Sequence, residues 1–370
     1  MRVNENILLS SLTTMRLGGP ARYVIEIENP QEIRDAYEFA RQYQLPAFAL
    51  GYGANTIGHD EGFNGVILIN RMRGISTTKN GDQTTLKIMG GEPWDAVVEY
   101  TCQQNLTGIE ALSKIPGLVG AAPVQNIGAY GQEIADTLDS IDVFDQQTHT
   151  FRTLTKSELN FSYRHSLLNT TEQGRYFVVA ITLTLRTGQM SRPFYNSIER
   201  YASDHGLTDF SPQGIRNIVS QIRADKLPDP REKASAGSFF KNIYLTDQEA
   251  ELAEDKGYPI HRGKDGNKIN VAWLIEQSGL KGKLIHGIRV SDTAPLVLIN
   301  ESAKSYADLA KARDQVIGAV YDKFGYWLEQ EPVELTSTQT KVPPLGFMPN
   351  TNPSPNNPSM PGPIFSGANQ

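Results

Sequence analysis

One glycine-rich stretch limits the possible folds of this chain more than any other feature. Residues 115–133 read IPGLVGAAPVQNIGAYGQE and contain four glycines and two prolines. A regular helix or strand cannot continue through such a segment. Long glycine-rich loops usually carry function, because their backbone N–H groups can face a diphosphate and a flat ring can approach closely. We therefore expect a cofactor-binding loop here, with a purely structural loop as the alternative.

The composition narrows the class of protein. The 370 residues are enough for two or three domains, and 39% hydrophobic with 21% charged residues is ordinary for a globular protein. The net charge of −6 argues against a nucleic-acid binder. A single cysteine, Cys102, excludes an intrachain disulfide, and the six histidines form no metal-ligating motif, so we predict no metal site. Because no long apolar run or signal peptide is present, we expect a cytoplasmic protein without membrane contact.

Residues 1–72 are predicted to form a small α/β unit. A strand, a helix, a second strand and a glycine turn follow one another, and "GVILIN" adds a further buried strand. Asn29 is suited to cap the helix, Pro30 to occupy its first position, and Glu32 to complete a capping box. The helical face expected to be buried comprises Ile33, Ala36, Tyr37 and Ala40.

Residues 73–210 are predicted to form a second unit rich in strands. Strands are expected at 84–90 and 176–188, with two more around a polar turn within 139–155. A helix is expected between them, since Trp94, Val97, Val98 and Cys102 share one stripe of the segment 92–108. Cys102 is therefore interpreted as a core residue rather than a reactive thiol.

Residues 211–324 are predicted to form a third unit, and 325–335 to return to the first. The third unit contains "AGSFFKN", a helix around "VAWLIEQSG" and the strand "APLVLIN". A long helix from near Ser305 should turn Leu309, Val316, Val320 and Phe324 inward. Residues 336–370 are rich in Pro, Asn and Ser and are predicted to be disordered.

A second glycine loop, "LGYGANT", follows a predicted strand. It is not a dinucleotide-binding fingerprint, because the third glycine would fall at Thr56. Alone it would be interpreted as an ordinary turn. Two glycine loops in this order, however, resemble the FAD-binding domain of the vanillyl-alcohol-oxidase-like flavoproteins.

Five further matches make the resemblance more specific. "PGLVGAAPVQNIGAYGQE", "FSYRHS", "KLPDP", "AGSFFKN" and "WLEQE" are similar to segments of the UDP-N-acetylenolpyruvoylglucosamine reductases, over a range from about Ser11 to Glu331. The resemblance implies an α+β protein. It would have a two-subdomain FAD-binding fold of the vanillyl-alcohol-oxidase-like type and a C-terminal α+β substrate-binding domain. The implied reaction uses FAD and NADPH to reduce UDP-N-acetylglucosamine enolpyruvate to UDP-N-acetylmuramate, and a monomer is expected.

The resemblance also implies three catalytic residues whose types suit this chemistry. Hydride addition to the outer enolpyruvyl carbon moves negative charge toward the carboxylate, and a proton must then reach the inner carbon. Ser238 matches the proton donor and Arg164 the catalytic arginine, which can engage a carboxylate. Glu331 matches the catalytic glutamate, for which we predict a raised pKa. Glu329 is the rival, because in a strand both side chains would face the same way. In isolation, each residue would be interpreted as a turn hydroxyl or a surface ion pair.

Binding residues are implied in the same way. The cofactor-binding residues would be Gly51, Tyr52, Gly53, Ala54, Asn55, Thr56, Pro116, Gly117, Gly120, Ala121, Ala122, Asn126, Gly128 and Ala129. The substrate-binding residues would be Tyr195, Arg223, Lys226, Asn242 and Tyr258, with Tyr258 on a mobile lid. Ala54, Ala121 and Ala122 stand where relatives have serines, which could weaken FAD binding. A flavin-dependent oxidase of the same fold and a degenerate, non-catalytic homologue are the alternatives.

Overall fold

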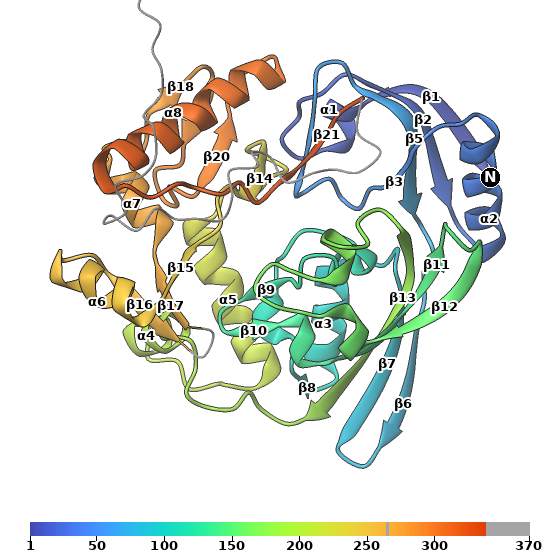
Figure 1. Cartoon of the computed structure of the whole chain (residues 1–370). Helices are drawn as coiled ribbons and strands as arrows, with labels where there is room; N and C mark the ends of the chain where they lie inside the picture. Colours follow the sequence, from blue (N-terminus) through green and yellow to red (C-terminus); the bar gives the residue numbers. More distant parts are fainter. Residues whose placement is uncertain (264–265, 338–370) are drawn as a thin grey trace, which may run out of the picture.

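A four-stranded sheet forms the N-terminal part of the computed structural model, which describes residues 1–263 and 266–337 (Figure 1). The elements are β1 Arg2–Leu8, α1 Leu9–Leu12, β2 Pro20–Ile27, α2 Pro30–Gln42, β3 Ala47–Ala49 and β5 Phe63–Asn70. The strand order is β1-β2-β5-β3, and only β1 runs antiparallel to its neighbour. The predicted tail lies outside the described residues from position 338 onward.

The α2 helix has the predicted buried face and nearly the predicted cap. Its buried residues are Ile33, Ala36, Tyr37 and Ala40. Asn29 Oδ1 accepts the Glu32 N–H at 3.1 Å, and Pro30 occupies the first helical position. The Glu32 carboxylate accepts the N–H of Glu28 at 2.8 Å, one residue before the position that a capping box requires. The predicted capping box was therefore wrong in this one bond.

A six-stranded antiparallel sheet forms the second unit. Its elements are β6 Ile75–Asn80, β7 Gln83–Met89, α3 Trp94–Gln103, β8 Leu106–Thr107, β11 Leu138–Asp145, β12 Thr150–Thr155 and β13 Tyr176–Thr187. The order is β12-β11-β13-β7-β6, and β8 also pairs with β13. Cys102 lies on the buried face of α3, and burial raises the pKa of its thiol to about 12. The prediction of a non-reactive core cysteine is confirmed.

The helices α4 (Asn196–Asp204) and α5 (Pro212–Lys226) pack as a pair against the second unit. Arg216 on α5 is buried and donates two hydrogen bonds to Asp95 on α3, at 2.6 and 3.1 Å. Their shared core includes Ala111. The division at residue 210 assigned α5 to the third unit, whereas its buried face lies on the second.

The C-terminal domain contains two small sheets and three helices. Its elements are β14 Ser235–Ser238, β15 Ile243–Leu245, α6 Asp247–Asp255, β16 Ile260–Gly263, β17 Gly266–Ile269, α7 Val271–Gln277, β18 Leu284–Ile285, β19 Ile288–Val290, β20 Val297–Asn300 and α8 Tyr306–Phe324. The sheets have the orders β14-β20-β19-β18 and β15-β17-β16. On α8, Leu309, Val316 and Val320 are buried and Phe324 packs against the same core, as predicted.

The first unit and the C-terminal domain share a core and a strand pair (Figure 1). β21 (Val333–Leu335) runs parallel to β4 (Thr56–Gly58), so the end of the described chain returns to the first unit. The buried Glu334 carboxylate accepts hydrogen bonds from Tyr306 at 2.7 Å and Arg313 at 2.9 Å on α8. Among the described residues, no helix is long and apolar enough to span a membrane.

Candidate active site

The loop Gly51–Asn55 follows β3, and the backbone N–H groups of this loop are free to bind a ligand. Gly53 has a φ of +64°, and a Cβ there would lie 2.1 Å from the Leu12 carbonyl oxygen, so only glycine fits. Thr14 holds the loop by donating its N–H to the Gly53 carbonyl at 3.1 Å. Within the described chain, the N–H groups of 51–55 donate to no protein acceptor. Free N–H groups in one tight loop are suited to a diphosphate.

The second glycine loop lies against the first, but fewer of its donors are free than expected. A Cβ on Gly51 would lie 3.2 Å from that of Ala121. Val119 and Gly120 donate their N–H groups to the carbonyls of Glu92 and Gly90, at 2.9 and 2.8 Å. Ala121 and Ala122 also donate, to the carbonyls of Leu118 and Val119, so the expectation of free donors was wrong for positions 119–122. No atom lies within 4 Å of the place where a Cβ of Gly117 would be, so a ligand can still approach the backbone of this loop.

Asn126, expected among the cofactor-binding residues, has its side chain engaged within the protein. It is fully buried, and its Nδ2 donates to Glu133 Oε2 at 2.7 Å and to the Ser162 carbonyl at 3.1 Å. Its Oδ1 accepts the N–H of Ala135 at 3.2 Å. The amide therefore joins the small hairpin of β9 (Gly128–Ala129) and β10 (Gln132–Glu133) to the turn that carries Arg164.

Arg164 lies at the tip of a tight turn with a left-handed backbone. Ser162 and His165 exchange two backbone hydrogen bonds of 3.1 Å, and the φ of Arg164 is 54°. This conformation is unfavourable for a non-glycine residue and often marks a functional site. The guanidinium donates from Nη2 to the Gly128 carbonyl at 3.0 Å, and Asn169 donates to the Arg164 carbonyl at 3.0 Å.

The Glu331 carboxylate meets Arg164 in a largely buried ion pair. Glu331 Oε1 lies 3.2 Å from Arg164 Nε and accepts a hydrogen bond from Gln125 Nε2 at 3.2 Å. Burial raises the pKa of Glu331 above its usual value, although the charges of Arg164 and Lys241 oppose the shift. The predicted raised pKa is confirmed. Burial is the largest influence on Arg164 and opposes its charge, but Glu331 together with Tyr163, Glu133 and Tyr244 outweighs burial and raises the Arg164 pKa.

The structure separates the two candidate glutamates. Glu329 is exposed, and Lys241 Nζ lies 2.7 Å from its Oε1. Glu331 instead extends its side chain to Arg164. Gln330, between them, forms an isolated antiparallel bridge with Phe240, so the two carboxylates differ in their partners rather than in the backbone that carries them.

Ser238 is the last residue of β14. The next residue, Phe239, contacts the backbone of Glu331. Phe239 accepts the Glu331 N–H at 2.9 Å, so the two segments are adjacent. The Ser238 residue is exposed, and no described group hydrogen-bonds its hydroxyl. Gly237 has a φ of +71°, which permits the turn before the serine. The Phe239 and Phe240 rings are core residues.

Three of the five predicted substrate residues can be related to this centre or its surroundings. Asn242 lies near enough to Tyr163 to influence the pKa of its hydroxyl, and the Arg164 guanidinium lies 5.0 Å from the centre of the Tyr163 ring. Arg223 and Tyr130 influence each other's pKa in the same way, and the Tyr130 ring lies 6.1 Å from that of Tyr195. Lys226 is exposed at the end of α5. Burial lowers the pKa of Arg223.

Tyr258 is not joined to these residues by any described contact. Its ring packs against Trp273 at 5.5 Å and Phe324 at 5.4 Å in the C-terminal core. His261 instead lies 5.9 Å from the Tyr195 ring.

Sequence reasoning missed three residues of the site. Gln125, Tyr130 and Tyr163 stand inside the motifs that carried the resemblance. Their place inside these motifs was the signal that could have identified them. Which neighbours of a matched residue reach into the site depends on contacts between distant loops.

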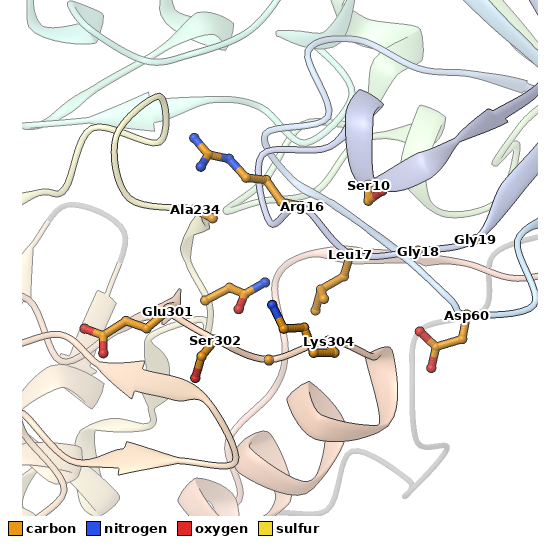
Figure 2. A pocket seen from close by; sticks show the side chains of 12 residues that line it. Ser10, Arg16, Leu17, Gly18, Gly19, Asp60, Ala234, Glu301, Ser302 and Lys304 are labelled. Carbon is orange, nitrogen blue, oxygen red and sulfur yellow. The ribbon is translucent and has the colours of Figure 1, made fainter.

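A separate polar cavity of about 510 Å³ lies where the first unit meets the C-terminal domain (Figure 2). Arg16, at its edge, donates to the Pro230 and Arg231 carbonyls at 3.3 and 2.5 Å. Asp60 accepts the Tyr306 N–H at 2.8 Å. None of the predicted site residues lines this cavity, and its polar side chains join the two parts of the chain.

Comparison with known proteins agrees with this architecture. Residues 21–154 match the model of an FAD binding domain. Residues 229–335 match the model of the UDP-N-acetylenolpyruvoylglucosamine reductase C-terminal domain. The solved structure of such a reductase from Thermus caldophilus shares the fold, with a TM-score of 0.61 and 22% identity over 91% of this chain and 100% of that one.

Similar proteins of the same name match nearly the whole sequence. UDP-N-acetylenolpyruvoylglucosamine reductase of Aliivibrio fischeri is 34% identical over 90% of this chain and 94% of its own length. The enzyme of that name from Escherichia coli K12 is 34% identical over 88% and 95%, respectively. Since identity and coverage are both high, the chain belongs to the UDP-N-acetylenolpyruvoylglucosamine reductase family.

Proposed function

We propose that this chain reduces UDP-N-acetylglucosamine enolpyruvate to UDP-N-acetylmuramate, with NADPH as the reductant and FAD as the bound cofactor. The observation that carries the proposal is the meeting of Arg164 and Glu331 in a largely buried ion pair of 3.2 Å. The strand that ends in Ser238 lies directly beside it, because Phe239 accepts the Glu331 N–H. These are the three residue types that the reaction requires.

The described residues fit FAD. The free N–H groups of 51–55 can hold its diphosphate, and the open face at Gly117 leaves room for a flat group. Bound FAD supplies the hydride that the reaction needs. The protein has to hold the substrate, exclude water and stabilise the charge that follows.

Arg164 can stabilise that charge while it keeps its contacts with Glu331 and Gly128. Its Nε lies against Glu331 and its Nη2 donates to Gly128. In the described chain, Nη1 has no protein acceptor, so it can donate to the substrate carboxylate. A fixed donor of this kind contributes about 3 kcal/mol of transition-state stabilisation. Glu331, whose pKa is raised by burial, holds the guanidinium in place through the contact with Nε.

Ser238 delivers the proton to the inner enolpyruvyl carbon. A hydroxyl is a weak acid, but the enediolate formed by hydride addition is a strong base, so the transfer is favourable. The support is the position of Ser238 at an exposed strand end, with no described partner for its hydroxyl. Hydrogen bonds from β20 fix the strand.

The remaining assignments extend this proposal. Tyr195, Arg223, Lys226, Asn242 and Tyr258 would bind the nucleotide end of the substrate. We divide the chain into units 1–72, 73–210 and 211–324, although α5 packs on the second. We place the monomer in the cytoplasm, where a single buried cysteine stays reduced.

The proposal is tested with purified protein loaded with FAD. In the absence of oxygen, NADPH beyond the one equivalent that reduces the bound FAD should be consumed only when the enolpyruvyl substrate is present, and UDP-N-acetylmuramate should appear. Consumption of oxygen with release of hydrogen peroxide, independent of the enolpyruvyl substrate, would identify an oxidase instead. A protein that takes up no FAD would contradict both activities.

A further inference from the structure

The Glu331 carboxyl group is held on one oxygen only. Its Oε1 lies 3.2 Å from Arg164 Nε and accepts from Gln125 Nε2 at 3.2 Å. Among the described residues, none hydrogen-bonds Oε2. Because both donors point at Oε1, Oε2 is the carboxyl oxygen that is left open to a ligand.

Gln125 is itself fixed by the loop expected to hold the cofactor. Asn55 Nδ2 donates to Gln125 Oε1 at 2.9 Å and lies 3.5 Å from the Glu331 carbonyl oxygen. That carbonyl sets the orientation of the Asn55 amide, since only its nitrogen can donate. The Asn55 amide then sets the orientation of Gln125, whose own nitrogen must face Glu331.

We propose that Gln125 is a positioning residue, which holds Glu331 with Oε1 against Arg164 and turns Oε2 toward the reacting substrate. This inference rests on the proposed function, since it assumes that Glu331 acts at the reacting centre. Arg164 alone contacts Oε1 through a single nitrogen and would let the carboxyl group turn. The second donor, from a different loop, fixes its plane.

The test measures the two half-reactions separately in the FAD-loaded protein. In Gln125→Leu, we expect NADPH to reduce the flavin at the wild-type rate. Reoxidation by the enolpyruvyl substrate should slow tenfold to a hundredfold, on the order expected for a lost hydrogen bond to an ionisable group. If Gln125→Leu does not fold, Gln125→Met has similar length and tests the same loss.

A positioning role can be recognised because the effects of the Gln125 and Glu331 substitutions on the reoxidation rate should not add. Because Gln125 acts through Glu331, the double variant Gln125→Leu/Glu331→Gln should reoxidise no more slowly than Glu331→Gln alone. Gln330→Leu is the matched control. Gln330 contacts Arg313 and Glu334 rather than the Glu331 carboxyl group, so its effect should add to that of Glu331→Gln.

The pH profile gives a second readout. Losing a donor to the ionised carboxyl group should move the limb governed by Glu331 to higher pH in Gln125→Leu. The charged and titratable groups that face Glu331 are Arg164, Lys241 and Tyr163. The Glu331→Gln variant should lack this limb of the pH profile, and its absence there identifies which limb Glu331 governs.

Each failure has a distinct signature. If Gln125→Leu reoxidises at the wild-type rate while Glu331→Gln is slow, the role of Gln125 is overturned and the proposed function stands. Additive effects in the double variant would likewise reduce Gln125 to a structural residue. If the wild-type flavin is not reoxidised by the enolpyruvyl substrate, the proposed function itself fails.

Discussion

At the scale of single residues, Arg164 combines an unfavourable backbone with three separate directions of contact. Its φ of 54° places the guanidinium between Gly128 and Glu331. A lysine has one compact donor group and cannot satisfy both while reaching a substrate. The residue type is therefore set by geometry as well as by charge.

Arg164→Lys should separate these roles. We expect kcat to fall by about a hundredfold, because one fixed donor to the developing charge is lost. FAD content should change little, since the contact of Arg164 with the predicted cofactor residues is one hydrogen bond to the Gly128 carbonyl. Steady-state kinetics and the flavin spectrum check this. A variant with normal kcat would remove Arg164 from the reacting centre.

Ala54 offers a test of the cofactor loop. It is half-buried beside free N–H groups. We expect Ala54→Ser to bind FAD about fivefold more tightly, as one added hydrogen bond contributes ~1 kcal/mol. Titration of the FAD-free protein measures this, and Ala54→Val supplies bulk without a hydroxyl. Equal affinity in all three proteins would place the diphosphate elsewhere.

At the scale of elements, sequence periodicity predicted helix faces well and contacts between loops poorly. The buried stripes of α2 and α3 were correct, because a 3.6-residue period is local information. The packing of α5 on α3 was missed, since an amphipathic helix does not specify which core it covers. Glu331 was preferred over Glu329 through the resemblance alone. Their different environments arise from Arg164 and Lys241, which are distant in sequence.

The contact between α3 and α5 should make the free energy of unfolding depend on pH in the acidic range. Burial opposes ionisation of Asp95, but hydrogen bonds from Arg216 and the Lys114 N–H outweigh it and lower its pKa to about 2. A folded-state pKa below the unfolded one stabilises the protein above the unfolded value, and this stability is lost as pH falls. We expect about 2 kcal/mol to disappear between roughly pH 4 and pH 2.

Urea unfolding at a series of pH values measures this loss. Asp95→Asn should be less stable than wild type at neutral pH and should lack that part of the pH dependence. Identical pH dependence in the two proteins would show that the pair does not stabilise the fold.

At the scale of the whole molecule, the first unit and the C-terminal domain are joined through the loop that precedes β2. Met15 and Leu17 enter the C-terminal core. Thr14 donates its N–H to Gly53, and its hydroxyl donates to the Ser235 carbonyl at 2.6 Å. One residue therefore links the cofactor loop to the strand that carries Ser238.

The segment after Ser337 should be dispensable for the reaction. The match to the reductase C-terminal domain ends at residue 335, and the described chain already completes β21 there. We expect a chain that ends at Ser337 to keep its kcat/KM and its Tm. A large loss of either would assign residues 338–370 a role in the site or the fold.

The central claim is that Ser238 supplies the proton after hydride transfer, and stopped-flow absorbance of the flavin tests it most directly. Wild type and Ser238→Ala, both loaded with FAD, would be reduced by NADPH and then mixed with the enolpyruvyl substrate. The account predicts equal reduction rates and reoxidation that is orders of magnitude slower in Ser238→Ala. Equal reoxidation in both proteins would contradict it, because the proton would then come from another group.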